Sequence, residues 1–209
     1  GLLLLASLIF YAGVDLPHLP LLLAVAAVAW WGAFRVAHAK GPWPLRGLVV
    51  LLLLPLAAFK VAEAAGLGWA FPLGLSFYTF HCVSFLVDVS RGTIEPPRSG
   101  KSIFLYVAFF PQLVAGPITR AREILPQFGA LARPDAATAR RSVWRIYLGL
   151  LKKLAVANVA GILAHDVLRN PAQYHGYLVL LAVFAGRYFI YADFSGYTDI
   201  AIGAARLLG

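Results

Sequence analysis

The sequence predicts an all-α integral membrane protein built as a multi-helix bundle, and its composition is the first observation behind that prediction. Of its 209 residues, 61% are hydrophobic and 13% are charged, and the mean hydropathy is +0.78. A soluble domain carries about 25% charged residues. In hydrocarbon every backbone polar group needs an internal partner, which favours helices. The one cysteine, Cys82, excludes a disulfide framework and a cysteine metal site.

Apolar stretches of helical length are the second observation. They cover residues 2–14, 19–37, 47–62, 71–90, 146–168 and 176–192. A spanning helix needs about 20 apolar residues, so the first stretch is short. Pro55 lies inside the third stretch and is expected to kink it, because proline removes a backbone donor.

The placement of charge is the third observation. If the loop that holds Lys40 and Arg46 is cytoplasmic and the stretches alternate, most basic residues fall on that side, as the positive-inside rule requires. Among the 18 Lys and Arg residues the exceptions are Lys60, Arg169, Arg187 and Arg206. Basic residues on one membrane face attract lipid headgroups. The net charge of +9 therefore predicts membrane lipid as a partner, and not nucleic acid.

The middle of the chain predicts irregular and surface structure. Residues 102–116 are apolar but short, and Pro111, Gly116 and Pro117 interrupt or end them. This pattern is typical of a re-entrant or broken helix, which is tolerated where the backbone is buried or lines a wet cavity. A basic, mixed stretch follows, and Asp135 is placed to cap the next helix. Apolar and basic residues alternate there at helical spacing, which predicts an amphipathic surface helix.

The stretch YADFSGYTDIAIG, residues 191–203, places two aspartates in an apolar region. At the centre of a spanning helix an aspartate costs about 2.5–3.5 kcal/mol on insertion scales. The polar residues around Gly196 predict that the helix breaks there and then resumes. Asp193 and Asp199 would either cap the broken ends or line a polar cavity together with Tyr191 and Tyr197. Metal ligation is the weakest hypothesis, because no His or Glu lies nearby in the sequence.

A second polar group lies in FPLGLSFYTFHCVSFLVDVSRG, residues 71–92. His81 and Asp88 share one side of the predicted helix. His81 would either transfer a proton or make a hydrogen bond between helices. Asp88 and Arg91 are spaced for an i, i+3 ion pair that anchors the helix end.

The stretch FFPQLVAGPITR, residues 109–120, is the third polar group. Gln112 lies beside a proline in an apolar run. Arg120 would hold either a phosphate or carboxylate by two hydrogen bonds or a lipid headgroup. Nucleophile-elbow, zinc-protease and Walker motifs do not occur in the sequence. The residues alone therefore predict a polar-lined membrane protein without a complete catalytic constellation.

These motifs, in this order, resemble the membrane-bound O-acyltransferase family in its alginate O-acetyltransferase branch. The stretches that carry the resemblance are LLLLASLIFYAG, FPLGLSFYTFHCVSFLVDVSRG, YVAFFPQLVAGPITRAREILPQF, GLLKKLAVANV and YADFSGYTDIAIGAARLLG. The resemblance implies tilted helices around a thin centre, where a cytoplasmic donor meets an extracytoplasmic acceptor. The residues expected to line this path are Tyr78, His81, Gln112, Arg120, Asp193, Tyr197 and Asp199.

The resemblance also implies a reaction and a location. We expect transfer of an acetyl or other acyl group to hydroxyls of an exported polysaccharide, in a multi-pass protein of the bacterial cytoplasmic (inner) membrane. The expected donor is acetyl-CoA or an acyl-carrier thioester, with no bound cofactor and no metal. The expected partners are the polysaccharide acceptor and an extracytoplasmic acetyltransferase.

Two features depart from the family pattern. His81 stands where the family has glutamine, and we expect it to be a structural substitution because neutral histidine also donates and accepts. The family's catalytic histidine has no counterpart in the chain and is expected C-terminal to Gly209. Residues 1–209 are therefore expected to form one partial transmembrane domain, truncated at both ends and inactive alone.

Other functions stay open at this point. One is D-alanyl transfer of the teichoic-acid type, and the others are a non-enzymatic transporter or scaffold. A transporter would use two helix breaks, at residues 111–117 and 193–199. Transporters usually show paired halves with corresponding breaks, and this sequence shows no such symmetry.

Overall fold

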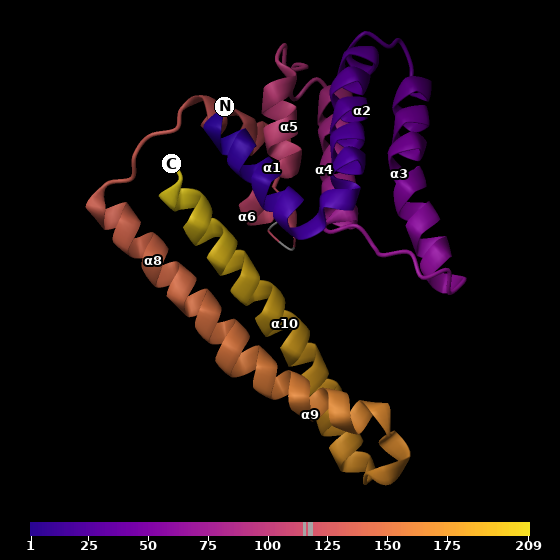
Figure 1. Cartoon of the computed structure of the whole chain (residues 1–209), viewed down its shortest axis with the longest axis vertical. Helices are drawn as coiled ribbons and strands as arrows, with labels where there is room; N and C mark the ends of the chain where they lie inside the picture. The colour runs from indigo at the N-terminus through magenta and orange to yellow at the C-terminus, as the bar shows by residue number, and fades with distance from the viewer. Residues whose placement is uncertain (115, 117–118) are drawn as a thin grey trace. The chain divides into compact units, whose positions relative to one another are not determined.

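The computed structural model describes residues 1–114, 116 and 119–209, and the regular elements of these residues are all helical (Figure 1). The all-α prediction is confirmed. The chain divides into two compact units, one formed by residues 1–114 and 118–131 and the other mainly by residues 132–209. The prediction of a single domain over residues 1–209 stays a prediction, and each unit is described by itself.

The first unit contains seven α-helices among its described residues. They are α1 (Leu2–Asp15), α2 (Leu19–Ala37), α3 (Trp43–Ala64), α4 (Leu75–Ser90), α5 (Gly100–Ala108), α6 (Phe110–Leu113) and α7 (Ala121–Gly129). A 3-10 turn, Leu16–His18, joins α1 to α2. Pro55 lies inside α3, which runs through it without interruption.

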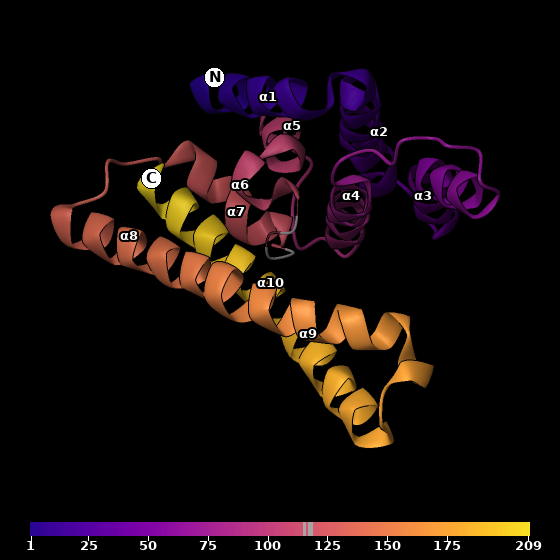
Figure 2. The same ribbon diagram turned by 60° about the horizontal axis from the view of Figure 1, so that its bottom comes forward.

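The second unit is a long helical hairpin. One arm is continuous from α8 (Ala136–Leu151) through a π-helical segment (Lys152–Ala157) into α9 (Asn158–Arg169). A 3-10 turn at Pro171–Gln173 leads to the other arm, α10 (Gly176–Leu207). The two arms lie side by side in both views (Figure 1, Figure 2).

Four segments of the described chain are long and apolar enough to cross a membrane. They are Leu2–Ala37, Trp43–Ala64, Ala136–Arg169 and Gly176–Leu207, and α4 is apolar but shorter. The prediction of a multi-pass integral membrane protein is thereby confirmed. The stretches predicted at residues 2–14 and 19–37 form one helical region, because only the 3-10 turn separates α1 from α2.

The core of the first unit lies between α2, α4 and α5. Small side chains on α2, including Ala26, Ala29 and Ala33, are buried, and they allow α4 to approach closely. From α4, Tyr78 and Phe85 are fully buried. Figures 1 and 2 both show α2 beside α4.

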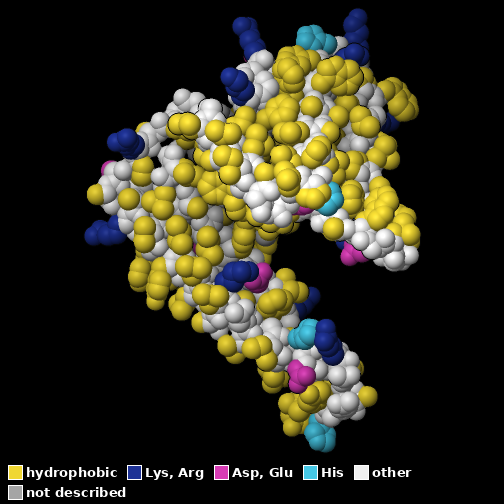
Figure 3. Space-filling view, viewed as in Figure 1, with side chains coloured by type: hydrophobic (Ala, Val, Ile, Leu, Met, Phe, Trp, Pro, Cys, Tyr) yellow, Lys and Arg dark blue, Asp and Glu magenta, His cyan; other side chains and the backbone are white. Residues whose placement is uncertain are grey.

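The first unit has one basic end. The Trp30 Nε1 donates a 3.1 Å hydrogen bond to the Pro97 carbonyl, which fixes the loop before α5 beside the C-terminal half of α2. Arg35 and Lys101 therefore lie near the same end, and Figure 3 shows dark-blue Lys and Arg side chains projecting from the upper end of this unit. This grouping agrees with the charge distribution expected of a cytoplasmic face.

Aromatic rings gather at the opposite end of the first unit. The Phe59 ring lies 5.6 Å from the His18 ring, 5.5 Å from Trp69 and 6.2 Å from Phe71, measured between centroids. The backbone N–H of Leu73 donates to the Asp15 carboxylate at 2.8 Å, which holds the two loops of this end together. Rings with a polar edge are typical of the membrane–water interface.

The predicted broken helix is confirmed as far as Val114. Phe109, with φ −56° and ψ 104°, separates α5 from α6. Pro111 lies in the first turn of α6, where its missing N–H costs nothing. The predicted interruption at Pro117 lies outside the described residues.

Gly74 lets the end of α6 lie close to the start of α4. Its φ is +71°, a left-handed conformation that glycine adopts without strain. A Cβ at this position would lie 2.5 Å from the Leu113 carbonyl oxygen. Glycine therefore allows both the positive φ and the close contact with Leu113. The helix α4 begins at the next residue, Leu75.

The two arms of the second unit meet along a seam of small residues. A Cβ on Gly149 would lie 2.5 Å from the Gly196 carbonyl oxygen, and a Cβ on Gly196 would lie 2.7 Å from the Gly149 carbonyl oxygen. A Cβ on Gly203 would lie 2.8 Å from the Ser142 carbonyl oxygen. Small residues let membrane helices pack backbone to backbone.

The prediction of a helix break at Gly196 is wrong, because α10 runs unbroken from Gly176 to Leu207. Gly196 lies within the helix, where its missing side chain allows α8 to approach closely, and it does not form a turn. The irregular element lies on the facing arm, as the π-helical segment Lys152–Ala157. Consequently Asp193 and Asp199 do not cap broken ends.

Candidate functional site

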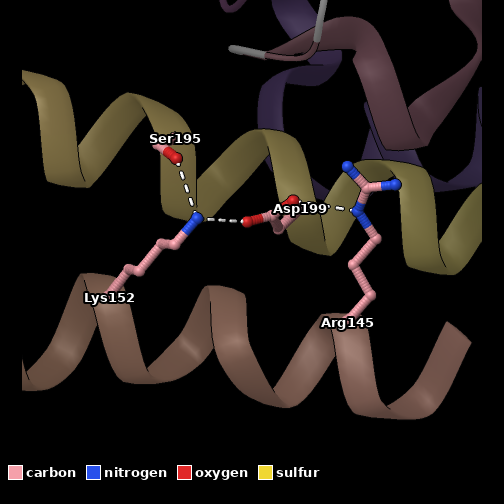
Figure 4. Close-up of polar contacts among 4 residues, drawn as sticks. All are labelled: Arg145, Lys152, Ser195 and Asp199. Atoms are coloured by element: carbon pink, nitrogen blue, oxygen red, sulfur yellow. Dashed lines mark hydrogen bonds and ion pairs between the residues drawn. The ribbon is translucent and has the colours of Figure 1, made fainter. Parts of the chain in front are cut away.

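A cluster of charged and polar side chains crosses the seam between α8 and α10 (Figure 4). We call it the charged cluster, and its members are Arg145, Lys152, Lys153, Asp193, Ser195 and Asp199. The cations come from α8 and the π-helical segment, and the anions come from α10. Both arms belong to segments apolar enough to cross a membrane.

Asp199 is held from two sides. Its Oδ1 accepts a hydrogen bond from Arg145 Nε at 2.9 Å, and its Oδ2 accepts one from Lys152 Nζ at 2.6 Å. Lys152 Nζ also donates to Ser195 Oγ at 3.0 Å. Lys153 forms a separate ion pair with Asp193. Each aspartate in this apolar region is thus neutralised across the seam.

The local helical geometry explains why two consecutive lysines both reach α10. Arg145, Gly149 and Lys152 recur at spacings of four and three, so they share one face of the arm. In a regular α-helix Lys153 would point about 100° away from Lys152. Both lysines lie in the π-helical segment, which departs from this regular spacing, and both bond to carboxylates of α10.

The cluster has three cations and two carboxylates, so its formal charge is positive. The side chain of Asp199 is 15% exposed, while Arg145 and Lys152 are 36% and 41% exposed. Arg145 uses only its Nε, and within the described chain its terminal nitrogens bind no other acceptor. An arginine with free terminal nitrogens is suited to a second anion.

The chemistry of the cluster is electrostatic and not nucleophilic. A serine becomes a nucleophile when a neighbouring base accepts its proton. Lys152 instead donates a hydrogen bond to Ser195 and is ion-paired with Asp199, so it is not placed to accept the serine proton. The arrangement can therefore hold or orient a polar group by charge, and no covalent role is assigned to Ser195.

Gln112 forms hydrogen bonds that link Tyr106 on α5 with Thr119, and we call Gln112, Tyr106 and Thr119 the Gln112 brace. Its Nε2 donates to the Tyr106 carbonyl at 2.8 Å, and its Oε1 accepts from the Thr119 hydroxyl at 2.7 Å. The Tyr106 hydroxyl donates in turn to the Thr119 carbonyl at 2.9 Å. These bonds tie both ends of the segment after α6 to α5, and Gln112 is 3% exposed.

Two other predicted residues, Tyr78 and His81, are buried on α4. The His81 ring packs at 5.4 Å from the Tyr106 ring, between centroids. Its Nε2 has no hydrogen-bond partner among the described residues. His81 thus contacts the α5 side chain beside the Gln112 brace, and its structural role stays a prediction.

The predicted ion pair between Asp88 and Arg91 is wrong. Among the described residues no ion pair joins them, and Asp88 is 6% exposed while Arg91 is exposed beyond the end of α4. The Asp88 carbonyl, and not its carboxylate, accepts from the Thr93 N–H at 3.0 Å and the Thr93 hydroxyl at 2.7 Å. The Asp88 side chain faces the core because it lies on the same face of α4 as buried residues such as Phe85.

The predicted site residues fall into two groups. Those in the first unit are Tyr78, His81, Gln112 and Arg120, and those in the second are Asp193, Tyr197 and Asp199. Arg120 is exposed at the N-terminus of α7. Tyr197 is half-buried on α10. Whether all of them line one path stays a prediction.

Sequence reasoning missed the cations of the charged cluster. It placed Arg145 and Lys152 on the membrane surface, as part of the cytoplasmic charge. The available signal was their position beside apolar residues, because basic groups within a spanning segment need anionic partners. In the described part of the chain, no three His, Cys, Asp or Glu side chains gather as a metal site would require.

The chain is similar to bacterial proteins named for the transfer of acetyl or D-alanyl groups. It is 32% identical over its whole length to the "Probable alginate O-acetylase AlgI" of Pseudomonas syringae, covering 44% of that protein. It is 27% identical over 96% of its length to the "Peptidoglycan O-acetyltransferase" of Helicobacter pylori, covering 46%. It is 25% identical over 66% of its length to the "Teichoic acid D-alanyltransferase" of Bacillus subtilis, covering 35%.

These similarities have a defined extent. The chain spans less than half the length of these relatives. No family model matches it. The alignments with the alginate proteins run through both units, and therefore include the charged cluster and the Gln112 brace.

Proposed function

Because this chain belongs to the membrane-bound O-acyltransferase family, we propose that its helices serve the transfer of acetyl groups to hydroxyls of an exported polysaccharide. The whole-length similarity to alginate O-acetylases supports this reaction class. The protein is a multi-pass protein of the bacterial cytoplasmic membrane.

The observation that carries the proposal is the charged cluster between two membrane-length helices. Three cations and two carboxylates are costly in hydrocarbon and mark a functional path by default. A polar acyl donor and a sugar hydroxyl can meet inside a bilayer only along a path lined by polar groups, and the charged cluster supplies such groups. Arg145, with free terminal nitrogens, is the member best placed to orient an anionic or carbonyl group.

The proposed reaction is a simple exchange. The carbonyl carbon of an acyl thioester, either acetyl-CoA or an acyl carrier, leaves sulfur and bonds to the oxygen of a sugar hydroxyl. The hydroxyl proton passes through a general base to the thiolate that leaves. No histidine of this chain is assigned as that base, and the charged cluster contributes orientation and charge stabilisation.

The two ends of the path differ in their proposed partners. The donor approaches from the cytoplasm, which the basic end of the first unit faces. The acceptor polysaccharide and an extracytoplasmic acetyltransferase are the proposed partners on the other side. Membrane lipid surrounds the apolar faces of the helices.

The alternatives receive less support. The D-alanyltransferases match only 66% of the chain, at 24–25% identity. A transporter with two helix breaks loses one of them, since α10 is continuous through residues 193–199.

The test uses cells in which the gene that encodes this chain is deleted and then restored. We expect exported polysaccharide from cells with Asp199→Ala to contain less than one tenth of the wild-type acetyl content, measured by NMR. The control is Glu63→Gln, which removes the exposed Lys60–Glu63 ion pair at the end of α3 and is expected to leave acetyl content unchanged. Wild-type acetylation by Asp199→Ala, with the protein present at equal amounts, would refute the role of the cluster.

A further inference from the structure

We propose that the groove between α9 and α10 binds an anionic phospholipid, with its phosphate on Arg169 and Arg187 and an acyl chain along the apolar wall. The groove is formed by the second unit alone. It shares no residue with the charged cluster, and the inference does not depend on acyl transfer.

The groove has the size and lining of a ligand site. Its volume is about 880 Å³, within the range of about 300–1,000 Å³ that is usual for such sites. Small residues, Gly161, Ala164 and Gly186, form its floor. Large side chains at its edges are strongly exposed, with Ile162 at 73% and Ile190 at 66%. A hydrocarbon chain fits such a surface better than water does.

Two arginines in the groove lack an anion. Within the described chain, Arg169 and Arg187 form no ion pair, whereas the cations of the charged cluster are all paired. The neighbouring acid, Asp166, accepts a hydrogen bond from the Tyr174 hydroxyl at 3.0 Å and is not part of the lining. An unpaired arginine in a spanning segment has a high free-energy cost, and a negatively charged ligand in the groove would reduce that cost.

Arg169 and Arg187 line the same groove from opposite arms of the hairpin. Side chains on a helix lean toward its N-terminus. By this rule Arg169, at the loop end of α9, leans away from the loop, and Arg187 on α10 leans toward the loop. His165 lines the groove on the α9 side. Two guanidinium groups that line one groove suit a phosphate, which accepts paired hydrogen bonds.

The position of the groove favours a lipid over a soluble anion. Arg187 lies eleven residues into α10, roughly 17 Å along the helix axis. Its aliphatic stem crosses apolar surface to bring the charge toward the headgroup level. The loop end of the hairpin carries the stacked pair His175 and Tyr177, which is typical of the membrane interface. A free phosphate would use the arginines but not the apolar wall.

The test is native mass spectrometry of the protein purified from its membrane. Three probes are compared, which are phosphatidylglycerol, phosphatidylcholine with the same acyl chains, and glycerol 3-phosphate. We expect phosphatidylglycerol to bind at least tenfold more tightly than either of the others. Equal binding of glycerol 3-phosphate would mean a soluble anion site and would overturn the lipid assignment.

Variants locate the lipid. Arg187→Gln is expected to weaken phosphatidylglycerol binding about tenfold, the value of one charge-assisted hydrogen bond. Gly186→Leu keeps both arginines but fills the floor, and is expected to weaken binding by a similar factor. Arg206→Gln, on the same helix but outside the groove, is the matched control. If both groove variants bind like this control, another part of the protein covers the groove and the proposal fails.

Discussion

The two units of the molecule bury polar groups in different ways. In the first unit a buried neutral side chain, Gln112, closes a ring of short hydrogen bonds with Tyr106 and Thr119. In the second unit charges meet across a seam of glycines. The first arrangement fixes one loop locally, whereas the second joins helix positions more than 40 residues apart. Charge is thus used where two long helices must keep one register.

The seam glycines give the largest expected effect. In Gly149→Leu the new side chain meets the Gly196 backbone at a distance no Cβ tolerates, so the arms must separate. We expect a loss of about 3 kcal/mol in unfolding free energy. Hydrogen exchange should rise in α8 and α10 while α2 and α4 stay protected.

Gly186→Ala is the matched control for that variant. A Cβ at Gly186 lies 3.5 Å from the Ala164 Cβ, an ordinary contact. Replacing a helical glycine with alanine then stabilises by about 0.5–1 kcal/mol. If both variants change the unfolding temperature equally, the tight seam is not what holds the arms together.

Removing the anion that bridges two cations gives the next effect. Asp199→Ala leaves Arg145 and Lys152 beside each other without a partner. We expect a loss of about 2 kcal/mol, less than for a fully buried pair because both cations are partly exposed. The loss should shrink at high salt, and thermal unfolding in detergent at two salt concentrations measures it. An identical loss at both would mean that charge is not the cause.

The neutral brace of the first unit should behave differently. Gln112→Ala leaves the Thr119 hydroxyl and the Tyr106 carbonyl without their bonds. The expected loss is about 1 kcal/mol, independent of salt, with increased hydrogen exchange confined to α5, α6 and α7. A salt-dependent loss would contradict the distinction between the two units.

The smallest effect concerns the start of α8. The side-chain oxygen of Asp135 accepts from the Thr138 N–H at 2.8 Å, which confirms the predicted cap. Hydrogen bonds from the Thr138 side chain and backbone hold the pKa of Asp135 below its usual value. The cap therefore stabilises the helix fully above about pH 4 and is lost as pH falls through the lowered pKa.

Hydrogen exchange at Thr138 measures this pH dependence. We expect protection of its amide to decline in acid in the wild-type protein. Asp135→Asn, which keeps a capping side chain without a titrating group, should show no such decline. A decline of equal size in both proteins would assign the acid effect to another group.

The fold class was predictable because it depends on composition and hydrophobic length. The four membrane-length segments and the cap at Asp135 follow from local signals, namely apolar runs and a side chain three residues before its donor. The break at Phe109 was predicted only approximately. Pro111 marks the region, but the backbone turns two residues earlier because proline is accepted in the first turn of a helix.

The sequence predicted the acidic residues of the charged cluster but not their basic partners. Asp193 and Asp199 stand out as acids in an apolar stretch, but their partners lie 40 to 54 residues away in sequence. Gly196 reads as a helix breaker when the helix is considered alone. Only the facing Gly149 shows that it serves close packing. Pairing across a hairpin is a tertiary property, which local pattern does not specify.

The measurement that tests the account most directly is a charge swap at the simplest pair of the seam. Within the described residues, Lys153 and Asp193 form an ion pair with each other and with no third group. Lys153→Asp and Asp193→Lys should each lower the unfolding temperature by placing like charges opposite one another, and the double variant should regain most of the loss. If the double variant is no more stable than the weaker single variant, opposite charge does not hold these helices together.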